Sequence, residues 1–223
     1  MRLKEVAPDI VQDIRYAGRH NFLGRPAAGY RKPVCVLTRE AAEALDRVQS
    51  ELRQSGLGLQ VFDCYRPESA SEDFLLWSGQ PGRRWMRIEF HPGMDKRELA
   101  AQGYVAGHRD HGRGSAVDLA IVPEGAGPDA FRPDGSLTPC NAPMKFLGSR
   151  FRDGALDFGT GYGCMDPLAH YAHPDLGTVA ACHRRMLREL MEKHGFRASD
   201  QAWWHFTLRK EPFPQSFFDF PVE

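Results

Sequence analysis

The sequence predicts an α+β fold in which helices flank a small mixed or antiparallel sheet. Helical and strand patterns mix along the 223 residues without the regular strand–helix–strand rhythm of a doubly wound sheet. Residues 115–122 form an apolar run that follows several glycines, a pattern typical of a strand after a tight turn. A chain of this length predicts one domain, residues 1–223, with a substantial core.

The N-terminal third predicts irregular structure followed by a helix. Residues 1–34 contain scattered glycines and prolines, with a strand near residues 10–16. Residues 41–52 carry apolar side chains at helical spacing. Thr38 is the expected N-cap of this helix, and Gly56 is its expected stop.

The middle of the chain predicts a strand, a helix and a loop. Residues 57–65 alternate as a strand does, and Pro67 stands where a helix would begin. Residues 79–96 are rich in glycine, proline and arginine and predict a loop. We expect this loop to line the protein's functional site. A short helix is expected over residues 95–102.

The C-terminal half predicts two glycine-rich loops, at residues 123–140 and 156–165, before a long helix. Residues 176–194 have helical periodicity, and residues 201–208 predict a strand. The residues expected to face the core from the long helix are Val179, Cys182, Met186 and Leu190.

Composition excludes several classes of protein. Lysine plus arginine equals aspartate plus glutamate, at 29 each, so the chain lacks the basic charge of a nucleic-acid binder. No apolar run approaches the roughly 18 residues of a membrane span, and the N-terminus has no signal-peptide core. Five cysteines without a C-x-x-C pair predict buried or inert thiols in a reducing compartment. We expect a cytoplasmic protein, or a periplasmic one if a signal peptide was removed, and the oligomeric state stays open.

Asp118 indicates a metal site because it lies inside the apolar strand. A carboxylate there is costly unless a positive charge compensates it. His111 stands seven residues earlier, and Gly112 and Gly114 let the backbone turn tightly between the two. Both side chains can therefore converge on one cation. The alternative is an aspartate held by backbone amides or an arginine, with His111 at the surface.

The run from His111 to Asp118, HGRGSAVD, resembles the HxxGxAxD part of the SxHxxGxAxD motif of zinc D-Ala-D-Ala peptidases. The most similar branch is the D-Ala-D-Ala dipeptidases, including those of vancomycin resistance. The resemblance covers nearly the whole chain in the family's order. It implies the small α+β fold shared by these peptidases and hedgehog signalling domains. The further matching runs are DIRY at 13–16, DCYRP at 63–67, WWH at 203–205 and FFDFP at 217–221.

The resemblance implies that His205 is the third metal ligand beside His111 and Asp118. Taken alone, a histidine among aromatic residues is more often a core residue. Two histidines and one aspartate leave the fourth position of a tetrahedral zinc open to water, as in catalytic sites. We therefore expect one Zn²⁺ per chain, which polarises the peptide carbonyl and lowers the pKa of the attacking water.

Two further roles follow from the resemblance. It assigns to Arg66 the stabilisation of the oxyanion in the tetrahedral intermediate. The alternative for Arg66 is a surface pair with Asp63 or Glu68, which contributes little. Tyr16 matches a family tyrosine near the amino end of the substrate, or else packs as a strand aromatic.

Three positions depart from the family pattern. Ala202 stands where the family has a glutamate that acts as general base and acid, and alanine cannot take a proton. Gly163 replaces an aspartate that helps to hold the substrate's ammonium group. Arg109 replaces the serine that opens the motif, where it would contact a substrate carboxylate or face water.

Together these observations predict a zinc metallopeptidase that hydrolyses D-Ala-D-Ala or a related short dipeptide from the cell wall, by attack of zinc-bound water. Ala202 predicts that this chain is impaired. It is either an engineered removal of the base or the mark of a natural zinc-bearing pseudoenzyme that binds a small peptide or amino acid without turnover. A third alternative is a structural domain whose two histidines and aspartate hold no metal.

Overall fold

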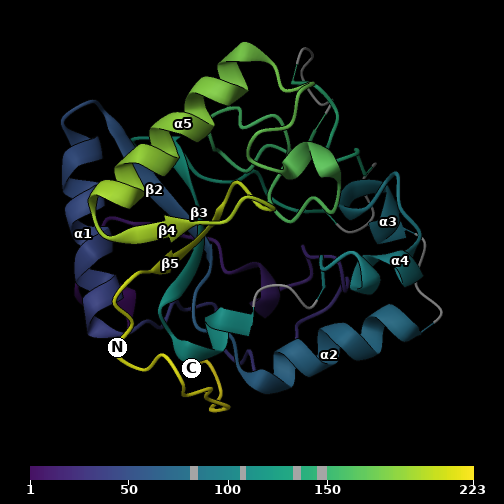
Figure 1. Cartoon of the computed structure of the whole chain (residues 1–223), viewed down its shortest axis with the longest axis horizontal. Coiled ribbons are helices and arrows are strands. Elements are labelled where there is room, and N and C mark those ends of the chain that lie inside the picture. The colour runs from purple at the N-terminus through teal and green to yellow at the C-terminus, as the bar shows by residue number, and fades with distance from the viewer. Residues whose placement is uncertain (81–84, 106–108, 133–136, 145–149) are drawn as a thin grey trace.

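A five-stranded mixed sheet forms the centre of the computed structural model (Figure 1), which describes residues 1–80, 85–105, 109–132, 137–144 and 150–223. The strands run in the order β1-β2-β3-β5-β4. The first pairing is parallel and the other three are antiparallel, so the expected α+β fold is confirmed. The strands are β1 (Val11–Gln12), β2 (Leu57–Asp63), β3 (Ala116–Pro123), β4 (Phe196–Ala198) and β5 (His205–Leu208).

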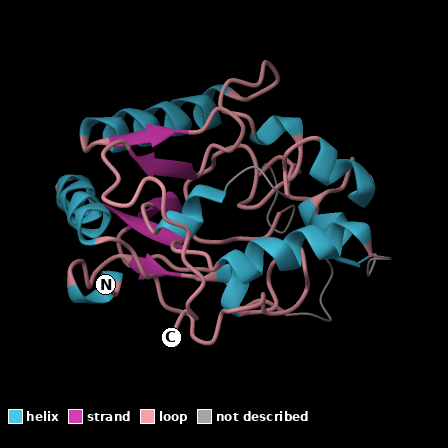
Figure 2. Ribbon diagram, turned by 60° about the horizontal axis from the view of Figure 1, so that its bottom comes forward, coloured by secondary structure: helices cyan, strands magenta, loops and turns pink. Residues whose placement is uncertain are grey.

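The helices form two groups on either side of the sheet (Figures 1 and 2). The first group packs α1 (Arg39–Arg53) against β2 and α5 (Thr178–Lys193) against β4. The second group contains α2 (Glu68–Gly79), α3 (Trp85–Phe90) and α4 (Lys96–Ala101). Short 3-10 helices connect these elements: η1 (Leu3–Glu5), η2 (Arg15–Ala17), η3 (Arg109–Arg113) and η4 (Pro167–Ala169).

The helix expected after Thr38 is confirmed as α1, and its apolar stripe faces the core. Ala41, Leu45 and Val48 are fully buried. Thr38 occupies the N-cap position without capping the helix, because its hydroxyl lies 3.0 Å from the Ser115 hydroxyl. The start of α1 is thereby tied to the turn that leads into β3.

Three expected elements differ from the structure. The strand expected at 10–16 is reduced to β1 followed by η2. The expected loop 79–96 contains α3, whose Met86 and Phe90 are buried one helical turn apart. Residues 81–84 of that loop lie outside the described residues. So do residues 107–108, which precede the glycine-rich turn between His111 and Asp118, and residues 133–136 of the loop 123–140. The strand expected from residue 201 begins only at His205. In contrast, the helix expected at residues 95–102 is confirmed as α4.

The core-facing stripe of α5 is rotated by one residue from the expected one. Val179 is 61% exposed and Cys182 is also exposed, so the prediction was wrong for these two residues. Met186 and Leu190 are partly buried and pack against the core. The buried positions are Ala180, Arg184, Leu187 and Met191. Arg184 is the reason, because its guanidinium donates to the carbonyls of residues 158, 168 and 170. Because the buried stripe contains a charged residue, apolar periodicity in the sequence does not identify it.

The prediction of free thiols was wrong for four of the five cysteines. Cys35 is bonded to Cys64, and Cys140 is bonded to Cys164. Cys182 is free and exposed. The partners lie 29 and 24 residues apart, so no local spacing announces them. Disulfides are typical of oxidising compartments, and the argument for a reducing one therefore fails.

No helix among the described residues combines the length and apolar character that a membrane crossing requires. The two termini lie next to each other, because the Arg2 guanidinium donates to the Glu223 carbonyl at 3.3 Å. The C-terminal segment therefore returns to the start of the chain (Figure 1).

The rotated stripe of α5 predicts that two alanine substitutions on this helix lower the free energy of unfolding by unequal amounts. Leu187→Ala should lower the free energy of unfolding by about 2–5 kcal/mol, because Leu187 is fully buried. Val179→Ala should change it by less than about 0.5 kcal/mol, because its side chain is mostly in water. Denaturant unfolding of both variants, with disulfides intact, measures this. A larger loss for Val179→Ala would restore the stripe expected from the sequence.

Candidate metal and substrate site

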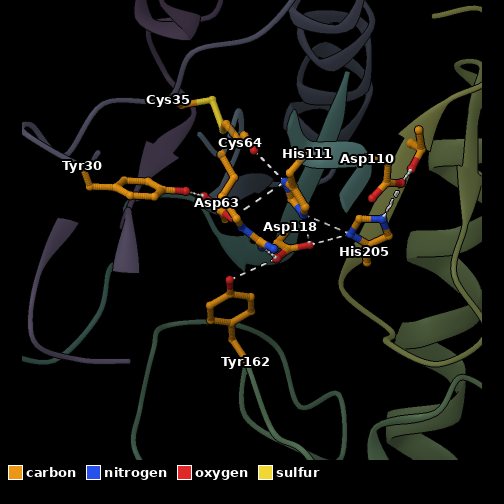
Figure 3. Close-up of polar contacts among 11 residues, drawn as sticks. Tyr30, Cys35, Asp63, Cys64, Asp110, His111, Asp118, Tyr162 and His205 are labelled. Carbon is orange, nitrogen blue, oxygen red and sulfur yellow. Dashed lines mark hydrogen bonds and ion pairs between the residues drawn. A yellow bond between two sulfur atoms is a disulfide. The ribbon is translucent and has the colours of Figure 1, made fainter. Parts of the chain in front are cut away.

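The candidate site lies where the strand register aligns polar side chains across the sheet. Asp63 on β2 pairs with Asp118 on β3, and Asp118 pairs with His205 on β5. These three residues therefore form one row across neighbouring strands, and His111 reaches the row from η3. Figure 3 shows the four side chains pointing toward one another. All four are buried.

Three atoms of this group converge closely enough to hold one cation. The Asp118 Oδ1 atom lies 3.2 Å from His111 Nε2 and 2.9 Å from His205 Nδ1. The two ring nitrogens lie 3.2 Å apart. A tetrahedral ion with bonds of about 2.0 to 2.1 Å would hold its ligand atoms about 3.3 Å apart. His111, Asp118 and His205 therefore form a possible metal-binding triad.

The charge of the surrounding groups also fits a divalent cation. Asp63, Asp110 and Asp118 supply three carboxylates, and Arg66 supplies one guanidinium near them. With neutral histidines the group has an excess of two negative charges, which one divalent ion would balance. Burial would lower the pKa of His205, but its hydrogen bonds to Asp110 and Asp118 raise that pKa to about 9. Without an ion, a proton on His205 therefore supplies part of the missing positive charge.

Each histidine is oriented by a partner on its far ring nitrogen. His111 Nδ1 lies 2.6 Å from the carbonyl oxygen of Cys64. His205 Nε2 lies 3.1 Å from Asp110 Oδ2. The two rings consequently present opposite nitrogens, Nε2 of His111 and Nδ1 of His205, to the shared point. Burial would raise the pKa of Asp118, but the two histidines hold that pKa well below its usual range.

Arg66 is a buried cation beside this point. Its Nη2 atom lies 2.7 Å from Asp63 Oδ2 and 3.9 Å from Asp118 Oδ2. Asp63 also accepts a hydrogen bond of 2.5 Å from the Tyr30 hydroxyl. Burial would lower the pKa of Arg66, but Asp63 and its neighbours raise it well above its usual range. The ion pair with Asp63 expected as one alternative exists, but it is buried in the site and not on the surface.

A cavity opens beside Asp118 and Arg66. Tyr16, Gly163 and Ala202 line it together with those two residues. The other described lining residues are largely aromatic or apolar: Phe22, Phe74, Gly103, Tyr104, Val105, Tyr162, Cys164, Met165, Gln201 and Trp204. Asp118 is the one carboxylate in this described lining. The cavity therefore combines a polar end at the triad with an apolar body.

Arg109 is not among the described lining residues of this cavity, but it lines a neighbouring cavity that shares Arg66 and Val105 with it. Its side chain is 64% exposed and donates to Glu68 Oε1 at 3.0 Å. Its guanidinium also lies 5.6 Å from the centre of the Phe217 ring. Arg109 is therefore an exposed side chain that is paired with Glu68 in this structure.

Ala202 reaches the cavity from a turn that precedes β5. The amide of His205 donates to the carbonyl of Ala202 at 3.1 Å, and the amide of Trp203 donates to Ala169 at 3.2 Å. On a regular strand, residues 202 and 205 would face opposite sides. The turn removes that conflict, so residue 202 lines the cavity while His205 joins the triad.

Gly163 also lines the cavity and has a backbone φ of +71°. A Cβ atom at this position would lie 3.4 Å from two ring carbons of Phe90. Tyr162, which precedes it, donates from its hydroxyl to Asp118 Oδ2 at 3.0 Å. Cys164, which follows, is held by the disulfide to Cys140. The cavity wall is therefore fixed on both sides of Gly163, by the Tyr162 hydrogen bond and by the Cys164 disulfide.

Several residues that surround the triad were not predicted from the sequence: Tyr30, Asp110, Tyr162 and Thr207. Asp110 is adjacent to His111 in the sequence, and Thr207 lies two residues after His205 on β5. Their closeness in the sequence to the two triad histidines could have identified Asp110 and Thr207 as candidate site residues. Tyr30 and Tyr162 carry no comparable signal, because only the tertiary fold brings them to Asp63 and Asp118.

Comparison with known proteins places these residues in a family. A profile of the Peptidase M15 family, described as D-ala-D-ala dipeptidase, matches residues 1–129 and 152–223. A D-alanyl-D-alanine dipeptidase of Enterococcus faecium is 37% identical over 222 residues, covering 99% of this chain and 96% of the relative.

Two further relatives extend the match. A D-alanyl-D-alanine dipeptidase of Streptomyces coelicolor is 33% identical and covers 98% of this chain and 95% of its own. A D-alanyl-D-alanine dipeptidase of Escherichia coli is 27% identical, with coverage of 92% and 82%. The family profile and the relatives at 33–37% identity agree over nearly the full length, and the chain belongs to the D-Ala-D-Ala dipeptidase family of M15 peptidases.

Proposed function

We propose that residues 1–223 form one zinc dipeptidase domain that acts on D-Ala-D-Ala or a related short dipeptide, and that Ala202 slows its turnover. The convergence of His111 Nε2, Asp118 Oδ1 and His205 Nδ1 beside a cavity carries the proposal. The named activity of the relatives supports a dipeptide substrate. The apolar body of the cavity fits small alanine side chains.

Zinc suits this site because two imidazole nitrogens and one carboxylate oxygen are its usual ligands in catalytic centres. The ligands to the one ion per chain are His111, Asp118 and His205. When bound, zinc polarises a peptide carbonyl and lowers the pKa of water. The partner groups of the two histidines keep the ligating nitrogens directed toward the ion.

Arg66 stabilises the negative charge that develops on the substrate's carbonyl oxygen. Its guanidinium is held by Asp63 and lies against the rings of Tyr16 and Phe74, at 5.2 and 5.1 Å from their centres. A cation fixed in this way loses little freedom during the reaction. Because it lines the cavity, it is available to a bound substrate.

Ala202 leaves the chain without the proton acceptor that its position would supply. A methyl group cannot accept a proton or pass one to the leaving amine. The one carboxylate in the described lining, Asp118, is engaged by His111 and His205. The second candidate function, a zinc-bearing protein that binds a small peptide or amino acid without turnover, is favoured by this same observation.

The substrate's amino end would lie near Tyr16 and Gly163 in the cavity. Gly163 offers no charge to an ammonium group, so this end is held by hydrogen bonds and aromatic contact. Arg109 would reach a substrate carboxylate only after leaving Glu68. The two disulfides favour an oxidising compartment such as the periplasm.

Metal content tests the ligand assignment. We expect purified protein to hold close to one zinc per chain, and His111→Ala and His205→Ala each to lose most of it. His183→Ala is the matched control, because His183 bonds the Asp157 carbonyl outside the triad. Elemental analysis after dialysis measures the ratio. Full zinc retention in both triad variants would reject the assignment.

Substitution of Ala202 tests the catalytic part of the proposal. Ala202→Glu should place a carboxylate on the cavity wall and raise the release of D-Ala from D-Ala-D-Ala by about 10²- to 10⁴-fold. Gln201→Glu is the matched control, because its side chain lines the same cavity one residue earlier. Rates are compared at equal zinc loading. If neither form hydrolyses any of a panel of D- and L-dipeptides, the binding protein becomes the better assignment.

Arg66 can be tested in the Ala202→Glu background. Arg66→Ala should lower turnover by about a hundredfold or more with zinc content unchanged. Arg66→Lys should recover only part of the rate, because an ammonium does not reproduce the planar guanidinium. Circular dichroism must first show that the variants are folded, since Asp63 loses its buried partner. Unaltered turnover in folded Arg66→Ala would limit Arg66 to its ion pair.

A further inference from the structure

The imidazole of His205 lies between two carboxylates, and only one of them belongs to the triad. On one side, Nδ1 lies 2.9 Å from Asp118 Oδ1. On the other side, Nε2 lies 3.1 Å from Asp110 Oδ2. Figure 3 shows Asp110 beyond the His205 ring, on the side away from Asp118. Asp110 therefore contacts a ligand of the proposed ion without facing the ion itself.

Thr207 holds Asp110 in this place. Its hydroxyl donates a short hydrogen bond to Asp110 Oδ2, the same oxygen that faces His205. Thr207 and His205 are two residues apart on β5, so their side chains emerge on the same face of the strand. Asp110 approaches that face from η3, next to His111 in the sequence. One short 3-10 helix thus supplies both a triad histidine and the partner of the other histidine.

The carboxylate determines which ring nitrogen of a neutral His205 carries the proton and which one can bind a cation. A carboxylate at 3.1 Å accepts a hydrogen bond, so the proton of a neutral imidazole is held on Nε2 and Nδ1 keeps its lone pair for a cation. A negative partner also makes the imidazole a stronger electron donor than a neutral partner does. The corresponding nitrogen of His111, Nδ1, has the neutral Cys64 carbonyl as its near partner at 2.6 Å, and the Asp63 carboxylate lies farther away at 3.8 Å. The two histidines are therefore supported unequally.

The arrangement also has a cost to folding that suggests a role beyond packing. The other carboxylate oxygen of Asp110, Oδ1, is buried and has no hydrogen-bond partner among the described residues. A buried unpaired polar atom typically destabilises a protein. A neutral asparagine or a smaller residue would avoid an unpaired charge at this position. The other oxygen of this carboxylate, Oδ2, contacts a proposed metal ligand.

We propose that Asp110, held by Thr207, is a positioning residue that fixes the tautomer and the orientation of His205 and strengthens its bond to the metal. This inference rests on the proposed metal function of the triad. It adds to that function two residues that act through His205 and do not touch the substrate. The contact between Asp110 and His205 would be partly lost if Thr207 no longer restrained the Asp110 carboxylate.

Zinc affinity of the full, disulfide-intact chain tests the inference, measured by competition with a chromophoric chelator. Asp110→Ala should weaken zinc binding by about 10- to 100-fold, the range typical for partners of metal-bound histidines. Asp110→Asn should show a smaller loss, because its amide oxygen still accepts from Nε2 but carries no charge. Thr207→Val should weaken binding less than Asp110→Ala does. Thr160→Val is the matched control, because its buried hydroxyl bonds the Trp203 ring and touches no triad residue.

A spectroscopic readout separates positioning from general loss of structure. The visible absorption bands of the Co²⁺-loaded protein should shift in Asp110→Asn and stay unchanged in Thr160→Val. Unchanged zinc affinity and Co²⁺ spectra in folded Asp110→Asn and Thr207→Val would overturn the inference, even if Asp110→Ala does not fold. Zinc retention in His205→Ala would instead reject the triad, so the two failures are distinguishable.

Discussion

The structure depends on compensation of the negative charge that strand register brings together in the sheet. Asp63 and Asp118 are directly paired on neighbouring strands and both are buried. Two adjacent buried carboxylates repel each other and lose their hydration, so each needs a positive or hydrogen-bonding partner. Asp63 is satisfied by Arg66 and Tyr30. The Oδ2 atom of Asp118 accepts from Tyr162 and lies 3.9 Å from Arg66, whereas its Oδ1 atom faces the two histidines. The point shared by Oδ1 and the two ring nitrogens therefore suits a cation.

Much of the scaffold around this row was predictable from the sequence. The stripe of α1 and the apolar run of β3 follow their ideal periods, so residue pattern alone identified them. His111 and Asp118 were found because a polar residue in an apolar strand and a glycine-rich turn are both visible in the sequence. His205 required the family resemblance, since a histidine among aromatic residues has no metal signature of its own. The structure brings these three together.

The remaining features depend on contacts between distant segments, which a local pattern does not encode. Arg184 occupies a core position because three backbone carbonyls surround it, and this rotated the face of α5 from the expected one. The disulfides join cysteines that only the fold brings together. One of them matters directly for the site, because the carbonyl of Cys64 orients His111. Tyr30 and Tyr162 were likewise missed, since their partners Asp63 and Asp118 lie far away in the sequence.

The central claim is that His111, Asp118 and His205 together hold one zinc ion, and an anomalous difference map of zinc-loaded crystals at the zinc absorption edge tests it most directly. We expect a single strong peak about 2.0 to 2.1 Å from His111 Nε2, Asp118 Oδ1 and His205 Nδ1. A peak bound elsewhere on the chain, or none within bonding distance of these three atoms at full zinc loading, would contradict it.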